Sequence, residues 1–255
     1  YNKMRKGESP FKQRYAESSI KKTHGILTAV YKRACRGKNR LPYNPMDEVL
    51  CPKIPKSDAE FYTDADLEKI YAALETIANN KHNGSTHDYG IFFRMLATNG
   101  FRIGEACALK WEDIDFKNRT VSIKRTWDKT RRCFNPPKTE RGKRTLQIFS
   151  DKVWNYLLEH REDSGLIFKT RNNLPLAYTN IKDTLNKAKA LAGVHHGNIH
   201  SFRHTAITNW LYMNNGNIPE VADMAGHEDP TITAKIYRHG IQTISAKNQT
   251  KFRVA

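Results

Sequence analysis

Apolar residues recur at intervals of three and four along much of this chain, which is the period of helices with one buried face. Cap residues and glycines bound several of these stretches. The pattern predicts helices from Ser18 or Ser19 to about Arg36, from Thr63 through Ile77, from about His87 to Asn99, from Arg102 to Leu109, from Ser150 through Leu158, from Thr179 to Gly193, from Ile199 to Met213, from Asn217 to Gly226 and from Asp229 to about Tyr237.

A second pattern, β-branched and aromatic residues between turn signals, occupies the middle of the chain. Residues 111–116 and 120–126 are predicted strands joined by a turn at 117–119, and residues 143–149 are their next partner. Between them, 128–142 are expected to form a basic, proline-containing hairpin loop with Lys138 near its tip. Residues 166–168 would add a short strand. We therefore predict a mainly α fold with a small antiparallel β-sheet, of the α+β class.

A change of composition near residue 50 predicts a domain boundary. Asn44-Pro45 breaks the chain, and residues 51–58 have the Pro and Lys content of an exposed, semi-rigid linker. We expect a basic helical domain at 1–51, a linker at 52–58, a larger domain at 59–240 and a tail at 241–255.

The net charge narrows the possible classes of binding partner. The 255 residues contain 43 Lys and Arg against 26 Asp and Glu, a net charge of +17, which favours a polyanion: DNA or RNA first, an anionic membrane surface second. Residues 1–58 alone hold 14 basic against 5 acidic residues. We expect DNA contacts from basic residues of the first long helix; a solvated charged face is the alternative. These residues are Lys21, Lys22, Lys32, Arg33 and Arg36.

Location follows from what the sequence lacks. No apolar run approaches the roughly 20 residues needed to span a bilayer, and no signal-peptide pattern opens the chain. Cys35, Cys51, Cys107 and Cys133 show no metal-binding or disulfide spacing, so we expect reduced thiols. The sequence thus predicts a cytoplasmic protein without a membrane partner.

Candidate chemistry concentrates in the last third. His200 and Arg203 are three apart on a predicted helix, as are Arg102 and Glu105 on an earlier one, so each pair projects from one face. Arg102, Lys138, His200, Arg203 and His227 are suited to bind one phosphate together, with Tyr237 as the nucleophile that attacks it. Singly, each has a plainer interpretation: an Arg102–Glu105 structural ion pair, a helix-end His227, or a packed Tyr237. His196, His200 and His204 also repeat at four-residue spacing, which raises metal-dependent hydrolysis as a weaker alternative.

Several motifs in order resemble the signatures of the tyrosine recombinases, the phage integrase family. They are Thr98-Asn-Gly100-Phe-Arg102-Ile-Gly-Glu105-Ala-Cys-Ala-Leu109, Pro137-Lys138-Thr139, His200-Ser-Phe-Arg203-His204, Ala225-Gly226-His227 and Tyr237. The resemblance covers about residues 59–240, and the basic region before it is similar to the end of that family's core-site-binding domain. The ten-residue step from His227 to Tyr237 resembles integrases of phages and conjugative transposons. Ala225 departs from the usual leucine, and the short amino-terminal part indicates that an arm-site-binding domain is missing.

The resemblance implies a mechanism that these residue types suit. Tyr237 would attack a DNA phosphodiester, form a 3′-phosphotyrosyl link and release a 5′-hydroxyl, with no ATP, metal or other cofactor. Arg102, Arg203 and His227 would donate to the phosphate oxygens. His200 would bind the phosphate or manage the tyrosine proton, and Lys138 would protonate the leaving oxygen. Glu105 would orient this set, and Lys143 would serve the DNA backbone.

The same resemblance implies partners and leaves two rivals. It implies double-stranded attachment or crossover sites, a homotetramer on DNA, an accessory excision factor and docking of the tail in cis or trans to regulate Tyr237. The tail carries Ile241, Ile244, Phe252 and Val254, more apolar surface than a free tail usually displays; a disordered terminus is the alternative. A type IB topoisomerase would share much of the site, and a non-catalytic DNA-binding regulator would keep only the charge.

Overall fold

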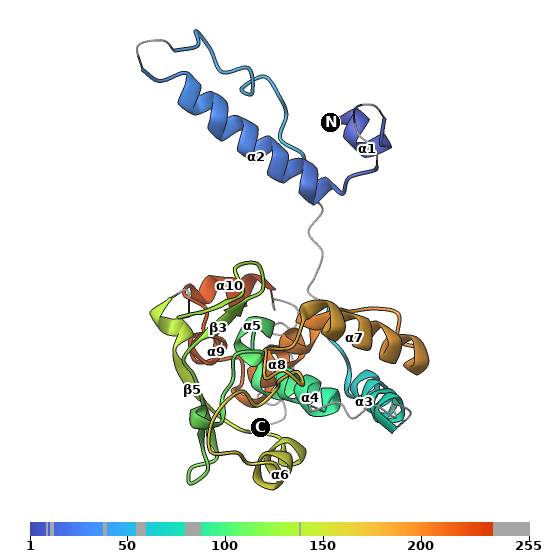
Figure 1. Ribbon diagram of the computed structural model, residues 1–255. Helices are drawn as coiled ribbons and strands as arrows, with labels where there is room; N and C mark the ends of the chain where they lie inside the picture. The colour runs from blue at the N-terminus through green and yellow to red at the C-terminus, as the bar shows by residue number, and fades with distance from the viewer. Residues whose placement is uncertain are drawn as a thin grey trace, which may run out of the picture. The chain divides into compact units, whose positions relative to one another are not determined.

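The computed structural model describes residues 1–8, 10, 13–37, 40–54, 60–79, 88–137 and 139–236, with the backbone alone at 235 and 236. The chain separates into two compact units, Tyr1–Ser57 and Asp58–Ala255 (Figure 1). The observed class is the predicted one, mainly helical with small antiparallel sheets. The four cysteines are unpaired.

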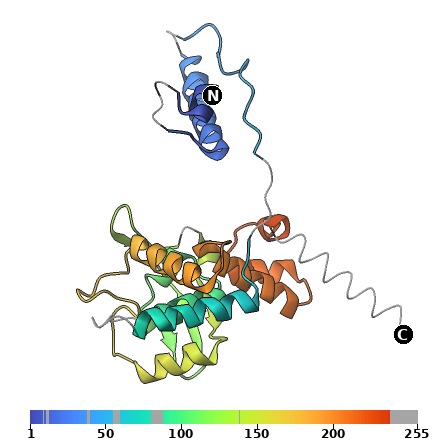
Figure 2. The same cartoon turned by 90° about the vertical axis from the view of Figure 1, so that its right-hand side faces the viewer.

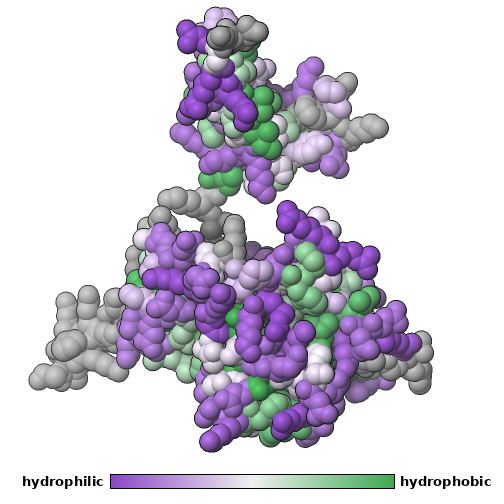
Figure 3. All heavy atoms as spheres, turned by 60° about the vertical axis from the view of Figure 1, so that its left-hand side comes forward, coloured by the Kyte–Doolittle hydropathy of each residue, from purple (hydrophilic) through white to green (hydrophobic). Residues whose placement is uncertain are grey.

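The first unit is built on one long helix. Helix α1 (Asn2–Lys6) precedes α2 (Glu17–Ala34), and the Tyr1 hydroxyl lies 2.7 Å from Nδ1 of His24 between them. The predicted cap is wrong: Ala16 is the N-cap, so Ser18 and Ser19 lie inside the helix. Of the apolar positions on α2 only Ile20 is buried, while Ile26 is 64% exposed. Apolar surface therefore lies among hydrophilic side chains in this unit (Figure 3).

Eight helices are described in the second unit. They are α3 (Asp64–Asn79), α4 (Tyr89–Asn99), α5 (Ile103–Ala106), α6 (Asp151–Glu159), α7 (Tyr178–Ala192), α8 (Ile199–Met213), α9 (Ile218–Ala225) and α10 (Pro230–Ile236). Thr63 and Ser150 supply the predicted side-chain caps, to the backbone N–H groups of Asp66 and Val153. Thr179 does not, because Ala177 is the N-cap of α7. Helix α5 is also shorter than predicted, ending at Ala106 instead of Leu109.

Helix α8 is the centre of the second unit. Helix α4 packs along it and α3 packs along α7 (Figures 1 and 2). Phe93 of α4 stacks on Phe202 of α8 with ring centroids 4.9 Å apart, and Phe92 meets Phe168 edge to face at 5.1 Å. All four rings are fully buried. Because most of α8 is buried, Arg203, which it carries into the site, is held by the core.

The strands form two small sheets instead of one. Strands β1 (Ile114–Asp115), β2 (Thr120–Ile123) and β5 (Arg144–Gln147) pair antiparallel in that order, with Val121 opposite Leu146. Residues 111–113, predicted as strand, form the 3-10 turn η1 (Trp111–Asp113). Residues 166–168 make only an isolated bridge, from Leu166 to Lys110.

The predicted 128–142 loop has internal structure. Strand β3 (Thr126–Asp128) pairs with β4 (Cys133–Asn135), with Trp127 opposite Phe134, and the 3-10 turn η2 (Glu140–Gly142) follows. The prediction of a single hairpin loop was therefore wrong. None of the helices in the described part of the chain is long and apolar enough to cross a membrane.

Candidate active site

Arg102 is placed by the turn between α4 and α5. Gly100 ends α4 with φ of 58°, and a Cβ there would come within 2.7 Å of the Trp210 ring, so glycine suits both the turn and the packing. Arg102 follows as N-cap of α5, and its backbone N–H donates to Glu105 Oε2 at 2.9 Å. Its side chain is 43% exposed and donates to Glu105 Oε1, also at 2.9 Å. The two side chains are in contact as predicted, but Arg102 is the extended N-cap before the helix, so the pair does not project from one helical face.

Arg203 reaches the same place from the core side of α8. It is 6% exposed and donates to the carbonyl oxygen of Gly100 and, at 2.6 Å, to that of Ala225. Its Nη2 also lies 3.0 Å from Nε2 of His227. A buried guanidinium with these partners is fixed in position, as a donor to a developing charge has to be.

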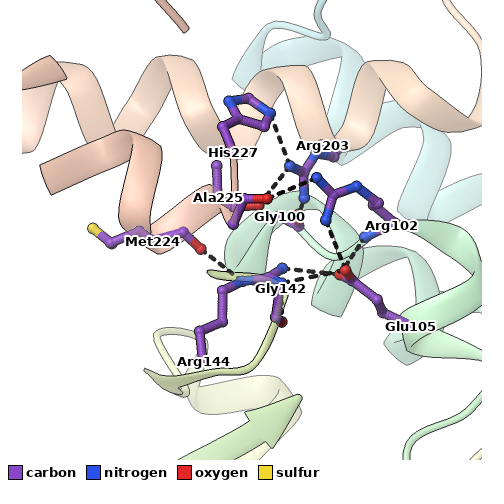
Figure 4. A network of polar contacts seen from close by, with 10 residues as sticks. Gly100, Arg102, Glu105, Gly142, Arg144, Arg203, Met224, Ala225 and His227 are labelled. Carbon is purple, nitrogen blue, oxygen red and sulfur yellow. Dashed lines mark hydrogen bonds and ion pairs between the residues drawn. The ribbon is translucent and has the colours of Figure 1, made fainter. Parts of the chain in front are cut away.

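The carboxyl end of α9 gathers three arginines (Figure 4). Its last carbonyl oxygens have no partner within the helix. Met224 O accepts from Arg144 Nε at 2.8 Å, Ala225 O accepts from Arg203 at 2.6 Å, and Gly226 O accepts from Arg102 at 2.9 Å. The negative end of the helix dipole favours these cations. Three successive carbonyls thus align three guanidinium groups.

His227 directly follows that helix end. Its backbone N–H donates to Ala222 O at 2.9 Å, and its Nδ1 lies 2.8 Å from Thr233 Oγ1. Because a guanidinium only donates, Nε2 accepts from Arg203 and Nδ1–H donates to Thr233. Burial and the charges of Arg203, Arg102 and Arg144 lower the pKa of His227 to about 4. The imidazole is therefore neutral at neutral pH.

Glu105 is the counter-charge of the cluster. Its side chain is 3% exposed, and Arg144 donates to both its oxygens, at 3.2 and 2.9 Å. Burial alone would raise the pKa of this carboxyl, but Arg144, Arg203 and Arg102 lower it to about 2. The carboxylate is thus ionised and fully engaged with arginines.

Sequence reasoning missed Arg144 and Thr233. Arg144 shares the inward phase of β5 with buried Leu146, while Thr145 and Gln147 face outward. A charged residue at an inward position of a strand is a signal of a buried pair. Thr233 had no signal, since only the packing of α10 brings it to His227.

His200 stands at the start of α8, next to the arginines. It is exposed, yet partial desolvation and the charges of Arg203 and Arg102 lower its pKa below 6.5. His204, one turn on, has a pKa of about 4 because of burial, His200 and Arg203. His196 precedes the helix and pairs with Asp66 at 3.4 Å, so the expected three-histidine helical face is wrong. In the described part of the chain no three His, Cys, Asp or Glu side chains are grouped to hold a metal ion.

A cleft of about 910 Å³ opens beside His200. It runs between the β3–β4 hairpin and the start of α5, and its lining includes Trp127, Lys129, Pro137 and Tyr178. Lys129 Nζ lies 3.7 Å from the centre of the Tyr178 ring. Of the described candidate site residues, His200 lines this cleft, whereas Arg102, Arg203 and His227 do not.

Two predicted catalytic residues, Lys138 and Tyr237, and the 241–255 tail lie outside the described residues. Lys143, predicted to serve the DNA backbone, is exposed and pairs with Glu140 at 3.1 Å. All five predicted DNA-binding residues are exposed; four lie on α2, and Arg36 follows the end of that helix at Ala34. Three of them, Lys32, Arg33 and Arg36, line a shallow hollow of about 570 Å³.

Comparison with known proteins gives the class. The model of the Phage integrase family matches residues 60–242, so the chain belongs to that family, the tyrosine recombinases. It is 25% identical over 280 residues to a "Tyrosine recombinase XerC-like" protein of Caldanaerobacter subterraneus subsp. tengcongensis, covering 94% of this chain and 66% of that protein. It is also 25% identical over 268 residues to an integrase of Staphylococcus phage L54a, covering 93% of this chain and 74% of that one.

A solved structure shows the same fold. The Tn1549 transposon integrase (residues 82–397, Y379F), in complex with transposon right end DNA, superposes with a TM-score of 0.71 at 20% identity. The match covers 94% of this chain and 81% of that one.

Proposed function

We propose that this chain is a site-specific DNA recombinase that integrates and excises a mobile element. Tyr237 attacks a DNA phosphodiester, and the bond between phosphorus and the 5′-oxygen breaks as the 3′-phosphotyrosyl link forms. The 5′-hydroxyl later attacks a partner strand, so bond energy is conserved and neither ATP nor a metal is required. The observation that carries this proposal is the convergence of Arg102, Arg203 and His227 on one point, within a chain of the phage integrase family.

The two arginines suit different parts of this task. Arg102, with a side chain 43% exposed, presents its guanidinium to an incoming phosphate, while Arg203, 6% exposed, is held by the carbonyl oxygens of Gly100 and Ala225. Planar forked donors match the nonbridging oxygens, on which charge builds in the transition state. Glu105 holds the Arg102 guanidinium in place and is itself held by Arg144.

His200 and His227 have different roles in this proposal: His200 accepts a proton and His227 binds the phosphate. His200 is neutral at neutral pH because its pKa is lowered, and a neutral imidazole can accept the Tyr237 proton. His227 accepts from Arg203 in the free protein, so donation to a phosphate requires it to take up a proton or shift its tautomer. The negative charge of a bound phosphodiester favours that uptake by raising the pKa of His227. Lys138 protonates the 5′-oxygen, and Lys143 contacts the DNA backbone.

The first unit is proposed to bind the core site of double-stranded DNA through α2. The four predicted basic residues on α2 and Arg36 just after it are exposed, and apolar surface lies beside them. The Tn1549 integrase is described bound to transposon DNA, which supports DNA as the partner here. We extend the proposal to a homotetramer on DNA, an accessory excision factor and docking of the 241–255 tail.

The test is covalent trapping. A duplex selected for binding from a randomised pool is nicked within its site, so that the cleaved fragment diffuses away and the adduct accumulates. The wild-type chain should form a band that survives denaturing electrophoresis, and Tyr237→Phe should bind the duplex without forming it. A persistent adduct with Tyr237→Phe, or none with the wild-type chain, contradicts the proposal. Relaxation of plasmids without exchange between two duplexes would favour a topoisomerase.

A further inference from the structure

The guanidinium of Arg144 donates more hydrogen bonds than an ion pair with Glu105 alone requires. Nε donates to Met224 O at 2.8 Å, Nη1 donates to Gly142 O at 3.1 Å and to Glu105 Oε1 at 3.2 Å, and Nη2 donates to Glu105 Oε2 at 2.9 Å (Figure 4). Its side chain is 6% exposed. A group this deeply buried does not meet DNA directly, so any effect on the reaction passes through its partners.

Those partners belong to three separate parts of the site. Glu105 holds Arg102 through both its backbone N–H and its guanidinium. Met224 lies three residues before His227, on the helix end that also receives Arg102 and Arg203. Gly142 ends the short turn that follows Lys138. The guanidinium of Arg144 therefore connects three parts of the site: Glu105, which holds Arg102; the helix end before His227; and the short turn that follows Lys138.

The loop after Lys138 is fastened to the histidine turn at a second point. Arg141 donates to Glu228 O at 3.0 Å and lies 3.6 Å from an oxygen of Asp223. Gly226 sits in the gap between them: a Cβ there would come within 2.8 Å of Arg144 Nη1 and 3.1 Å of Arg141 O. The contact is thus a close fit of backbone against guanidinium, which a bulkier or differently shaped group would disturb.

Lysine cannot reproduce this arrangement. An ammonium is a single point of charge, whereas Arg144 donates in three directions from one rigid plane. A lysine at position 144 could donate to the Glu105 carboxylate or to one of the carbonyl oxygens of Met224 and Gly142, but not to all three partners. Charge and alignment can therefore be separated experimentally at this residue.

We infer that Arg144 is a positioning residue of the recombination site, which aligns Arg102 and the His227 turn with each other through Glu105 and Met224. The inference rests on the proposed function for the reaction that it serves. Misplacing catalytic groups by about 1 Å can cost on the order of 10²-fold in rate. Arg144→Lys should therefore slow cleavage by about that factor while DNA affinity stays unchanged.

The experiment compares Arg144→Lys with a matched control, Arg125→Lys. Arg125 also serves a buried carboxylate, donating to Asp113 Oδ2 at 2.5 Å and to Ala108 O at 3.4 Å, and neither bond is to Glu105, Met224 or Gly142. Single-turnover cleavage of the nicked duplex is measured at saturating protein and at a temperature where each variant is folded. The control should cleave at the wild-type rate per folded molecule, and Arg144→Lys should not.

A second measurement needs no DNA. NMR titration of the His227 ring should show a raised pKa in Arg144→Met, because one of the neighbouring cations that hold it down is removed, and no change in Arg125→Met. If Arg144→Lys does not fold, Arg144→Met carries the rate comparison as well. Wild-type cleavage by Arg144→Lys, equal slowing in both lysine variants, or weakened affinity with an unchanged saturated rate would overturn the inference. An inactive wild-type chain would instead refute the proposed function, and the titration would still show whether Arg144 acts on His227.

Discussion

Replacing Glu105 by Gln should destabilise the protein by about 3 kcal/mol. The carboxylate is 3% exposed and accepts four hydrogen bonds, two from Arg102 and two from Arg144. Glutamine keeps one acceptor oxygen, turns an NH₂ group toward a guanidinium and leaves two cations without their counter-charge. Removing one partner of a buried pair costs roughly 3–5 kcal/mol.

The pKa gives an independent magnitude. The pKa of Glu105 falls from 4.5 to about 2, and each unit corresponds to about 1.4 kcal/mol, so ionisation contributes about 3 kcal/mol. Because the folded pKa is depressed, this stability is complete above pH 4.5 and is lost as the pH falls toward 2. The difference between wild type and Glu105→Gln should shrink over the same range.

Urea unfolding followed by circular dichroism, at neutral pH and at several lower values, measures this difference. Glu75→Gln is the matched control, because the Glu75 side chain is 63% exposed and its pairs with Arg94 and Lys152 are long, at 3.9 and 3.8 Å. It should cost under about 0.5 kcal/mol. If Glu105→Gln stays within about 1 kcal/mol of wild type, or if its deficit does not change with pH, Glu105 is not the counter-charge described here.

Three further predictions concern single groups. The pKa of His227 is lowered from 6.5 to about 4, so its neutral form should contribute up to about 3 kcal/mol to the free energy of unfolding above pH 6.5, and this contribution is lost as the pH falls toward 4. The free energies of unfolding of wild type and His227→Gln, measured in urea, should therefore depend differently on pH between 6.5 and 4. Parallel pH dependences would contradict this prediction. Alanine at Lys21, Lys22, Lys32, Arg33 and Arg36 should reduce the slope of log affinity against log salt by about 0.9 for each phosphate that the protein no longer neutralises, whereas an unchanged slope would remove α2 from the interface. Lys138→Ala should cleave slowly on normal DNA and be largely restored by a bridging 5′ sulfur, whose thiolate leaves without a proton, while Lys143→Ala should mainly weaken binding; rescue of Lys143→Ala instead would exchange the two roles.

The helices that carry the site were predictable because local signals bound them. Gly100 and Gly226 end α4 and α9 in the left-handed conformation, and Pro219 lies in the first turn of α9. The span of α8 was predicted residue for residue. Ser18, Ser19 and Thr179 misled because a cap-forming residue also tolerates a place inside a helix. The three-residue strand β4 is too short to show an alternating pattern.

The arginine cluster was predictable only in part. Arg102 and Glu105 are three residues apart, so their contact was predictable, although it forms between an N-cap and the third helical residue. Arg144 lies 39 residues from Glu105 and 80 from Met224, and these pairings depend on how β5 packs against α5 and α9. No local sequence pattern predicts pairings between residues so far apart in the chain, although an arginine at an inward strand position indicates that it has a buried partner.

The most direct test of the central claim is to identify the bond in the trapped adduct. The adduct from the nicked duplex is digested with nuclease and protease, and mass spectrometry locates the peptide that carries the nucleotide. We predict that the peptide contains Tyr237, and that the remaining nucleotide is joined through its 3′-phosphate with a free 5′-hydroxyl on the released strand. A nucleotide on another residue, or a link to a 5′-phosphate, would contradict the mechanism proposed for this chain.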